Sequence, residues 1–481
     1  MRAEARQWLL TVVASAGLLA GCAVGPDYKR PTTTPPEMFR GQTDPAEAAS
    51  LADLPWWEAF RDLTLQELLQ TALANNYDLR VAVARVEQAR ALAAVAWGAF
   101  FPSIGYSGSI SRSRGAASAV GVNPGESPPT QSLFVGVFTA AWELDVWGRI
   151  RRQNEAARAQ FLGTEEARRG VLLGLTSAVA QAYFELLELD ARLDIAKRNT
   201  DSFQSTYNLF RRRLEFGVAS TLETSRAEGA LGSAAATIPD LESQIAAKEN
   251  EISILLGRNP GPIPRGTPLF AQAVVPEIPA GLPSALLERR PDLLQAEQQV
   301  VQANALVGVA KANFFPQLNL TGFGGGASPE LSAFTNVWSL AAGLTGPIFQ
   351  GGQILETYRA NVAAWEQAKL QYEQAVITAF QEVASALTAL EKLVQVEAEQ
   401  ARAVKAYEDS VTIANKRYLG GLASYYEVLE AQQLLFPAEN QLAQVRADRL
   451  FTYVQLYKVL GGGWHLTDAQ WSGPQAKSQG Q

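Results

Sequence analysis

The sequence predicts a mainly α-helical fold, built as a tandem duplication, in which four short β-strands interrupt very long helices. The pattern of residues 148–231 returns at residues 352–435, with matching positions offset by 204 (352 − 148). No Gly or Pro interrupts residues 353–419, a stretch that would span roughly 100 Å as one helix. A Phe-Phe-Pro triplet precedes an alternating polar and apolar segment in each copy, at Phe100 and at Phe314.

The stretch 353–419 has the periodicity of a straight helix with two usable sides. Its apolar positions recur at about 3.6 residues per turn, which is closer to an undistorted helix than to the 3.5 of a left-handed coiled coil. Alanines such as Ala360 and Ala389 flank the apolar stripe and allow neighbouring helices to approach closely. The pattern fits one stave of a barrel of helices. A long antiparallel coiled coil with one dry seam fits the helix alone equally well.

Composition limits the chemistry that is open to the chain. The net charge is −7 and no basic block is present, so nucleic acid is not an expected partner. The chain has one cysteine, Cys22, and one histidine, His465. We therefore expect no disulfide, no zinc cluster, no metal site and no catalytic triad, and the sequence does not predict an enzyme.

The N-terminus reads as the export signal of a bacterial lipoprotein. Residues 1–21 combine a charged start with an apolar segment too short to span a bilayer. The signal ends in Leu19-Ala20-Gly21-Cys22, which resembles a lipobox. That resemblance implies removal of residues 1–21 and attachment of a diacylglycerol and an N-acyl chain to Cys22, with no other cofactor. Ala23 rather than Asp follows, which by the same resemblance favours the outer membrane.

Four segments alternate as strands with one polar and one apolar side. They are expected at about 103–113, 133–144, 317–324 and 336–346. The first hairpin is ten residues longer than the second, because the two Phe-Phe-Pro triplets are offset by 214 (314 − 100), and this places the difference at an exposed tip. A β-rich soluble cap is compatible with the alternation. If the strands cross a membrane, four cannot close a barrel, so copies must share one; two copies would give eight strands, and we expect three copies and 12 strands.

The long helices are expected to turn at two matching tips. The first runs from Arg149 to about residue 215, turns at 216–220 and returns from Thr221, and the second copy turns at 420–424. Gly217 and Gly421 can adopt positive φ there, and Ser220 and Ser424 can cap the returning helices. The predicted parts are a signal peptide (1–21), a lipidated strap (22–60), a first repeat (61–257), an equatorial, Pro-rich linker that acts as a belt (258–283), a second repeat (284–460) and a C-terminal tail (461–481).

Several segments spread over the chain resemble TolC-type outer-membrane efflux lipoproteins of the NodT branch. They are Cys22–Pro31, Trp56-Trp57, Phe60, the predicted helix 65–96, both Phe-Phe-Pro triplets and the run from Arg417 to Gln432. The resemblance implies a TolC-like fold: a homotrimer whose 12-stranded barrel in the outer membrane, with four strands per chain, continues into a long α-helical barrel in the periplasm.

The same resemblance suggests where the tube closes and what it binds. By position, Tyr426 and Glu430 would form the aperture gate, although the family usually has an aliphatic residue and an aspartate there. A periplasmic adaptor (membrane fusion protein) would dock at the tips, and an inner-membrane pump, of resistance-nodulation-division type by analogy, would supply energy. The docking tips would consist of Gly217, Val218, Ala219, Ser220, Gly421, Leu422, Ala423 and Ser424. Plain turn geometry also explains the tips, and a salt bridge with a neighbouring Arg also explains Glu430.

We therefore expect the outer-membrane channel of a tripartite efflux system, which passively exports small molecules. A structural periplasmic coiled-coil lipoprotein without a pore is the main alternative. A periplasmic hydrolase would need a nucleophile and base that the sequence does not offer.

Overall fold

The computed structural model describes residues 23–40, 50–114, 130–272, 281, 283–331 and 333–471. The chain divides into two compact units. One holds residues up to Pro31 with Val86–Thr164 and Ala296–Tyr372, and the other holds Thr32–Arg85, Glu165–Gln295 and Glu373–Gln481. The signal peptide and Cys22 lie outside the described residues.

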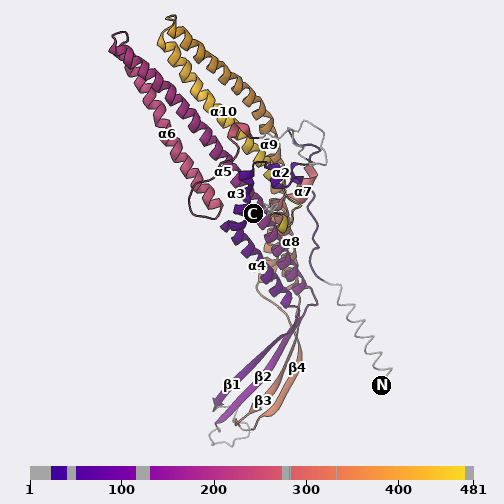
Figure 1. Ribbon diagram of the computed structural model, residues 1–481. Helices are drawn as coiled ribbons and strands as arrows, with labels where there is room; N and C mark the ends of the chain where they lie inside the picture. Colours follow the sequence, from indigo (N-terminus) through magenta and orange to yellow (C-terminus); the bar gives the residue numbers. More distant parts are fainter. Residues whose placement is uncertain are drawn as a thin grey trace, which may run out of the picture. The chain divides into compact units, whose positions relative to one another are not determined.

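The first unit contains one antiparallel sheet of four strands, in the order β1-β2-β3-β4 (Figure 1). Its strands are β1 (Ser103–Ser113), β2 (Gln131–Leu144), β3 (Gln317–Ser328) and β4 (Thr335–Thr345). Ser103 lies opposite Ala141 in the first hairpin, and Gln317 lies opposite Thr345 in the second. Strands β1, β2 and β4 lie within two residues of their predicted bounds. The predicted end of the third strand at 324 was wrong: β3 continues to Ser328, because Gly325 and Gly326 still pair with β4. The connection that makes the first hairpin longer falls at 115–129, outside the described residues.

The register sorts the side chains of the sheet onto two chemically different faces, because residues directly opposite each other share a face. One face carries large, exposed apolar side chains: Ile104, Tyr106, Ile110, Phe138, Trp338, Leu340 and Leu344. The other face carries mainly small polar side chains: Ser103, Ser107, Ser109, Ser111, Thr139, Thr321 and Ser339. A group of apolar side chains lies among them: Leu133, Val135, Val137, Phe323 and Val337. The predicted alternation is confirmed for β1 and β4, whereas β2 carries apolar side chains on both faces. A face this apolar and this exposed suits lipid better than water.

Long helices account for most of the rest of the chain. Each repeat has an entry helix, a very long outgoing helix and a shorter returning helix. These are α4 (Tyr77–Gly98), α5 (Arg149–Glu215) and α6 (Thr221–Leu255) in the first repeat, and α8 (Pro291–Ala312), α9 (Gln353–Leu419) and α10 (Tyr425–Val459) in the second. Both α5 and α9 have 67 residues, and Gly163, Gly170 and Gly174 do not interrupt α5. One window of α5 is long and apolar enough to cross a membrane, but 67% of it is buried inside the structure, as in a core helix.

The predicted helix 65–96 is in fact two helices. The chain forms α3 (Leu63–Asn75), breaks at Asn76 and resumes as α4. Asn76 has an extended ψ of 131°, and its side-chain oxygen accepts a hydrogen bond from the Leu79 amide at 3.0 Å. The prediction of one helix was wrong because asparagine can end one helix and cap the next.

The core of the second unit is built around aromatic side chains from both repeats. Trp56, Phe60, Tyr183 and Tyr457 are almost fully buried, and the Tyr457 hydroxyl donates to the Leu54 carbonyl. Short elements surround this core: η1 (Leu51–Asp53), α2 (Trp56–Ala59), η3 (Leu269–Ala271), η4 (Pro283–Ala285), α7 (Leu286–Arg289) and α11 (Asp468–Trp471). Part of the predicted tail is therefore docked, since the Trp56 indole donates to the Trp471 carbonyl at 3.0 Å.

Candidate functional site

The two tips are built on the same backbone plan. Gly217 and Gly421 have φ of +73° and +70°, which confirms the predicted left-handed positions. The Val218 amide donates a hydrogen bond to the Arg213 carbonyl at 2.8 Å, and the Leu422 amide donates one to the Arg417 carbonyl at 2.9 Å. These bonds close the outgoing helices by satisfying carbonyls that would otherwise lack a partner.

The caps of the two returning helices differ. The Ser220 hydroxyl accepts from the Glu223 amide, and the Glu223 carboxylate accepts from the Ser220 amide, so α6 begins with a capping box. Ser424 occupies the matching position in α10, but its side chain makes no capping hydrogen bond. The predicted cap is confirmed for Ser220 and wrong for Ser424.

The predicted docking residues lie at the surface. Gly217, Val218, Ser220, Gly421, Leu422 and Ser424 are exposed, and Ala219 and Ala423 are half-buried. Apolar side chains project from both tips, since Phe216, Val218, Leu419 and Leu422 are each more than 60% exposed. Exposed apolar side chains at the ends of two hairpins are typical of a protein-binding surface.

An aromatic cluster joins the two hairpins of one chain below the tips. The rings of Phe210 and Tyr425 lie 4.3 Å apart in an edge-to-face arrangement, and Tyr418 packs 5.8 Å from Tyr425. The Arg213 guanidinium donates to the Tyr418 hydroxyl. Burial raises the pKa of the Tyr425 hydroxyl, which therefore stays neutral. The hairpins α5/α6 and α9/α10 are thus tied together at this level.

The predicted gate residues lie on the open side of α10. Tyr425, Val428 and Leu429 point into the cluster, whereas Tyr426 is 62% exposed and Glu430 is exposed. Within the described part of the chain, no ion pair involves Glu430, so a salt bridge inside the same chain does not explain it. Both side chains are free to face another copy.

A cavity of about 520 Å³ lies beside the gate residues. Its lining comes from three helices: Asn199 and Phe203 of α5, Arg226, Gly229, Ala230, Ser233, Ala234 and Thr237 of α6, and Tyr426, Leu429, Gln432, Gln433, Phe436 and Pro437 of α10. A side chain added at Gly229 would meet only open space. The cavity is therefore open at this point of α6.

Sequence reasoning missed Arg226. It is the counterpart of Glu430 in the first repeat, as Leu222 is of Tyr426. Arg226 and Tyr426 line the same cavity. The repeat offset of 204 could have identified both counterparts, because subtracting it from the numbers of the gate residues gives Leu222 and Arg226.

The predicted belt is pinned to the second unit by charge. Asp62 is buried and accepts hydrogen bonds from the Thr267 amide at 3.1 Å and from the Gln272 side chain at 2.7 Å. Arg265 pairs with Asp190 of α5 at 2.8 Å and with Glu249 of α6. The belt therefore crosses both helices of the first hairpin.

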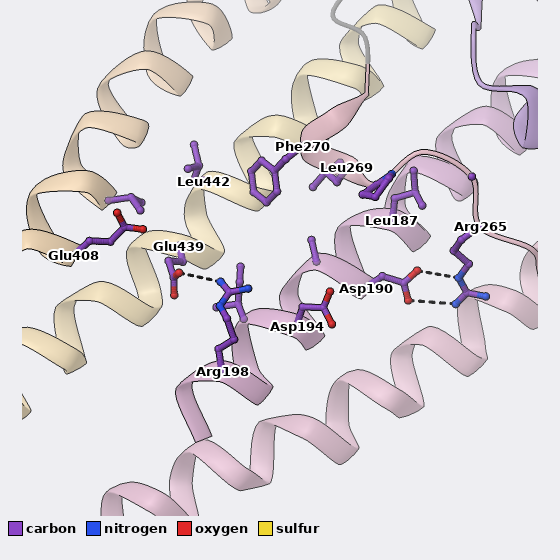
Figure 2. A pocket seen from close by; sticks show the side chains of 15 residues that line it. Leu187, Asp190, Asp194, Arg198, Arg265, Leu269, Phe270, Glu408, Glu439 and Leu442 are labelled. Carbon is purple, nitrogen blue, oxygen red and sulfur yellow. Dashed lines mark hydrogen bonds and ion pairs between the residues drawn. The ribbon is translucent and has the colours of Figure 1, made fainter. Parts of the chain in front are cut away.

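A second cavity, of about 450 Å³, adjoins the belt (Figure 2). Leu269 and Phe270 of the belt form an apolar wall, and Arg198 of α5 pairs with Glu439 of α10 at 3.0 Å. Asp194 is exposed at the rim. Among the described residues no group of three or more His, Cys, Asp or Glu could hold a metal ion.

The start of the strap is seated in the first unit. The Val24 amide donates to the Trp147 carbonyl at 3.0 Å, and Asp27 pairs with Arg152 of α5 at 2.7 Å. A Cβ atom at Gly25 would lie 2.6 Å from the backbone of Gly308 in α8. The strap is thus fixed immediately after Cys22 and close to the end of β2.

Comparisons with known proteins agree on one family. The model of "Outer membrane efflux protein" matches residues 68–258 and 282–462. The probable efflux pump outer membrane protein TtgC of Pseudomonas putida is 34% identical over 96% of this chain and 97% of that protein. The cation efflux system protein CusC of Escherichia coli K12 is 32% identical over 92% of this chain and 97% of that protein.

Solved structures give the same answer. The outer-membrane channel OprN superposes with a TM-score of 0.85 at 30% identity, over 92% of this chain and all of the other. The open state of the Neisseria gonorrhoeae MtrE outer membrane channel superposes with a TM-score of 0.82 at 30% identity, over 92% of this chain and 99% of the other.

Proposed function

The chain belongs to the outer membrane efflux protein family, and on that premise we propose that three copies share one 12-stranded barrel that continues into a periplasmic tunnel. It is an outer-membrane channel component of an efflux system. The observation that carries the trimer is the sheet of four strands, with one apolar face and two edges that no strand of the described chain covers. Such edges are not stable in lipid, and three sheets are enough to enclose a water-filled lumen.

The proposed tunnel carries small molecules passively, and its only covalent additions are a diacylglycerol and an N-acyl chain on Cys22. The seated strap supports this anchor, because it holds the residue after Cys22 beside the start of α5. Two or three acyl chains give stable membrane attachment, whereas one does not.

The proposed gate is the ring formed by Tyr426 and Glu430 of three copies. Three carboxylates close together repel one another, so contacts between neighbouring hairpins have to hold the ring closed. The exposed faces of Tyr426 and Glu430, and the absence of an ion pair at Glu430 within the described chain, support a role between copies.

A periplasmic adaptor, acting with an inner-membrane pump of resistance-nodulation-division type, is the proposed partner at the tips. Its contact surface would combine residues 217–220 and 421–424 with the cavity beside them. Tyr426 lines that cavity, so a helix bound there would touch the gate directly. Binding opens the gate only if the adaptor has a higher affinity for the open arrangement.

The gate is tested by single-channel recording in planar bilayers. Replacing Tyr426 and Glu430 together with Ala should raise the conductance, because both the bulk and the charge at the narrowest ring are removed. The matched control replaces Leu222 and Arg226, the counterparts in the first repeat, and should raise it less. An unchanged conductance in the first variant would remove Tyr426 and Glu430 from the gate. An equal rise in both variants would show that the first repeat contributes as much to the gate as the second.

Docking is tested by filling the cavity. A Cβ atom added at Gly229 would have no neighbouring heavy atom within 4 Å, so we expect the variant Gly229→Leu to retain the fold. Pull-down of the periplasmic adaptor that works with this channel should weaken at least tenfold, while native mass spectrometry should show that trimer formation is unchanged. Undiminished binding would show that the adaptor does not bind in this cavity.

A further inference from the structure

The two outer strands of the sheet each have an unpaired edge within the described chain. β1 and β4 are the end strands of the order β1-β2-β3-β4, and all of β1 is exposed. Each has one edge of amide and carbonyl groups without a neighbouring strand in the described chain. If three copies share one barrel, β4 of one copy must pair with β1 of the next. We call this junction between copies the seam, and its register decides which residues lie opposite each other.

The internal repeat supplies the register. Residues of β1 correspond to β3 through the Phe-Phe-Pro offset of 214 (314 − 100), and residues of β2 correspond to β4 through the offset of 204 (352 − 148). The observed hairpins agree with both offsets. Ser103 lies opposite Ala141 in the first hairpin, and their counterparts, Gln317 and Thr345, lie opposite each other in the second. The two hairpins are therefore equivalent residue by residue.

The pairing between the hairpins can be carried over in the same way. Within the chain, Ala140 of β2 lies opposite Gly322 of β3, and Ala141 lies opposite Thr321. Resting on the proposed shared barrel, we infer that β4 of one copy pairs antiparallel with β1 of the next, with Leu344 opposite Gly108 and Thr345 opposite Ser107. The partner surface is a second copy of this chain.

The side chains fit this register. Leu344 is 70% exposed and meets a glycine, and Ile110, 75% exposed, meets Ala342, so each large side chain faces a small one. The same large-to-small pairing occurs inside the chain, where Phe138 lies opposite Gly324. On the other face, Thr345 meets Ser107, which continues the row of small polar side chains.

Shifted registers fit less well. A shift by one residue would bring Leu344 opposite a serine and place its apolar side chain among the polar ones. A shift by two residues keeps the faces but sets Leu344 opposite Ile110 or Tyr106 and breaks the equivalence with the observed pairing of β2 and β3. The inferred register keeps Leu344 on the apolar face and retains that equivalence.

The seam should be weakest next to the helices. Its register places Pro347 opposite Gly105, and proline has no amide hydrogen to donate to the ladder. Just beyond it, Ile348 would lie opposite Ile104, as their counterparts Leu144 and Leu318 do within the chain. Both isoleucines are highly exposed in the single chain, so their contact would cover apolar surface at this end.

Paired cysteines test the register in the full-length protein in its membrane. Directly opposed Cα atoms are about 4.5–5.5 Å apart in an antiparallel pair, within the range that a disulfide bridges. A shift of two residues adds about 6.8 Å along the strand and takes the pair out of reach. The test pairs are Gly108→Cys with Leu344→Cys and Ser107→Cys with Thr345→Cys, one on each face of the sheet.

Matched controls use the same β4 cysteine with a shifted β1 cysteine. These are Ile110→Cys with Leu344→Cys, Tyr106→Cys with Leu344→Cys, and Ser109→Cys with Thr345→Cys. The parent chain without added cysteines reports any background from Cys22. Each single-cysteine variant is first checked for trimers by native mass spectrometry, so that failure to fold is not mistaken for a failure to cross-link.

After mild oxidation, at least one in-register pair should give covalent trimers at ten or more times the yield of the shifted pairs. Trimers that cross-link through a shifted pair, or through none of the pairs, overturn the register and leave the shared barrel standing. Absence of trimers from the parent chain overturns the shared barrel itself, and the seam with it.

Discussion

In each repeat, a side chain just before the entry helix binds the last carbonyl of the returning helix, and we call this contact the joint. The two repeats form the joint with different side chains. In the first, the side-chain amide of Asn76 donates to the Leu255 carbonyl at the end of α6, at 2.9 Å. In the second, the counterpart Arg290 donates to the Val459 carbonyl at the end of α10, at 3.1 Å, and also pairs with Asp292 and Glu382. The backbone of the joint is conserved between the repeats, whereas its side chains have become neutral in one and charged in the other.

The tips show a similar division. Their glycines have nearly the same φ, yet only the first repeat has a capping box. The exposed residues Leu222 and Arg226 of the first repeat are replaced by Tyr426 and Glu430 in the second. Duplication therefore preserved the turns and let the exposed side chains diverge. We expect the functional differences between the hairpins to lie in those side chains.

The largest expected effect comes from the glycines that end the returning helices. Gly257 and Gly461 have φ of +69° and +77°, and an added Cβ would lie 2.4 Å from the Asn75 carbonyl oxygen and 2.9 Å from that of Arg289, respectively. Gly257→Ala should cost about 4 kcal/mol, from a left-handed conformation and a backbone overlap. Gly461→Ala should cost less. Denaturant unfolding of the purified variants measures both, and the reverse order would contradict an equivalent joint.

The charged joint should be the more sensitive to loss of its donor. Arg290→Met leaves two carboxylates without their cation and should cost about 3 kcal/mol. Asn76→Ala removes one cap and one hydrogen bond and should cost about 1.5 kcal/mol. Unfolding curves of the two variants under the same conditions compare them. Equal losses would show that the ion pairs add nothing to the joint.

The caps give a smaller and more selective difference. Ser220→Ala removes a capping box and should cost about 1 kcal/mol, mostly as fraying of α6. Ser424→Ala removes no side-chain hydrogen bond and should leave stability almost unchanged. Amide hydrogen exchange at the first turns of α6 and α10 measures this locally. Faster exchange at α10 in Ser424→Ala would mean that Ser424 caps its helix after all.

The smallest expected effect is the pH dependence of the charged joint. Burial alone would raise the pKa of Asp292, but the hydrogen bond and charge of Arg290 outweigh it and lower that pKa. The carboxylate therefore contributes stability above the ordinary aspartate pKa of about 4, and this contribution is lost as the pH falls through the lowered value. Because the side chain is 55% exposed, the contribution should be a few tenths of a kcal/mol.

Asp292→Asn should remove that part of the acid-induced loss, which stability measurements between pH 6 and 3 would detect. Asp78→Asn at the matching position of the first repeat is the control. A larger change in the control would place the acid-sensitive group in the other repeat.

Sequence patterns predicted the repeated framework well, because strand alternation, uninterrupted helices and tip glycines are local properties. They predicted both 67-residue helices to the residue and three of the four strands within two residues, but ended the third strand at 324, four residues too early. What they missed depends on contacts between distant segments or on one side chain's choice of partner: the break at Asn76, the missing cap at Ser424, the cavity beside Tyr426 and the binding of Arg265 to two helices. The roles of Tyr426 and Glu430 need other subunits, which a single chain cannot display.

The seat of the strap sets an order of events during biogenesis. The residues around Gly25 contact Gly308 of the second repeat as well as the start of α5, so the seat is incomplete until most of the polypeptide has been made and exported. If Cys22 receives the proposed acyl groups early, the chain would be attached to the bilayer before the residues around Gly25 have their partners. Seating of the strap would then be a late step, and a chain truncated before residue 308 would leave these residues unseated.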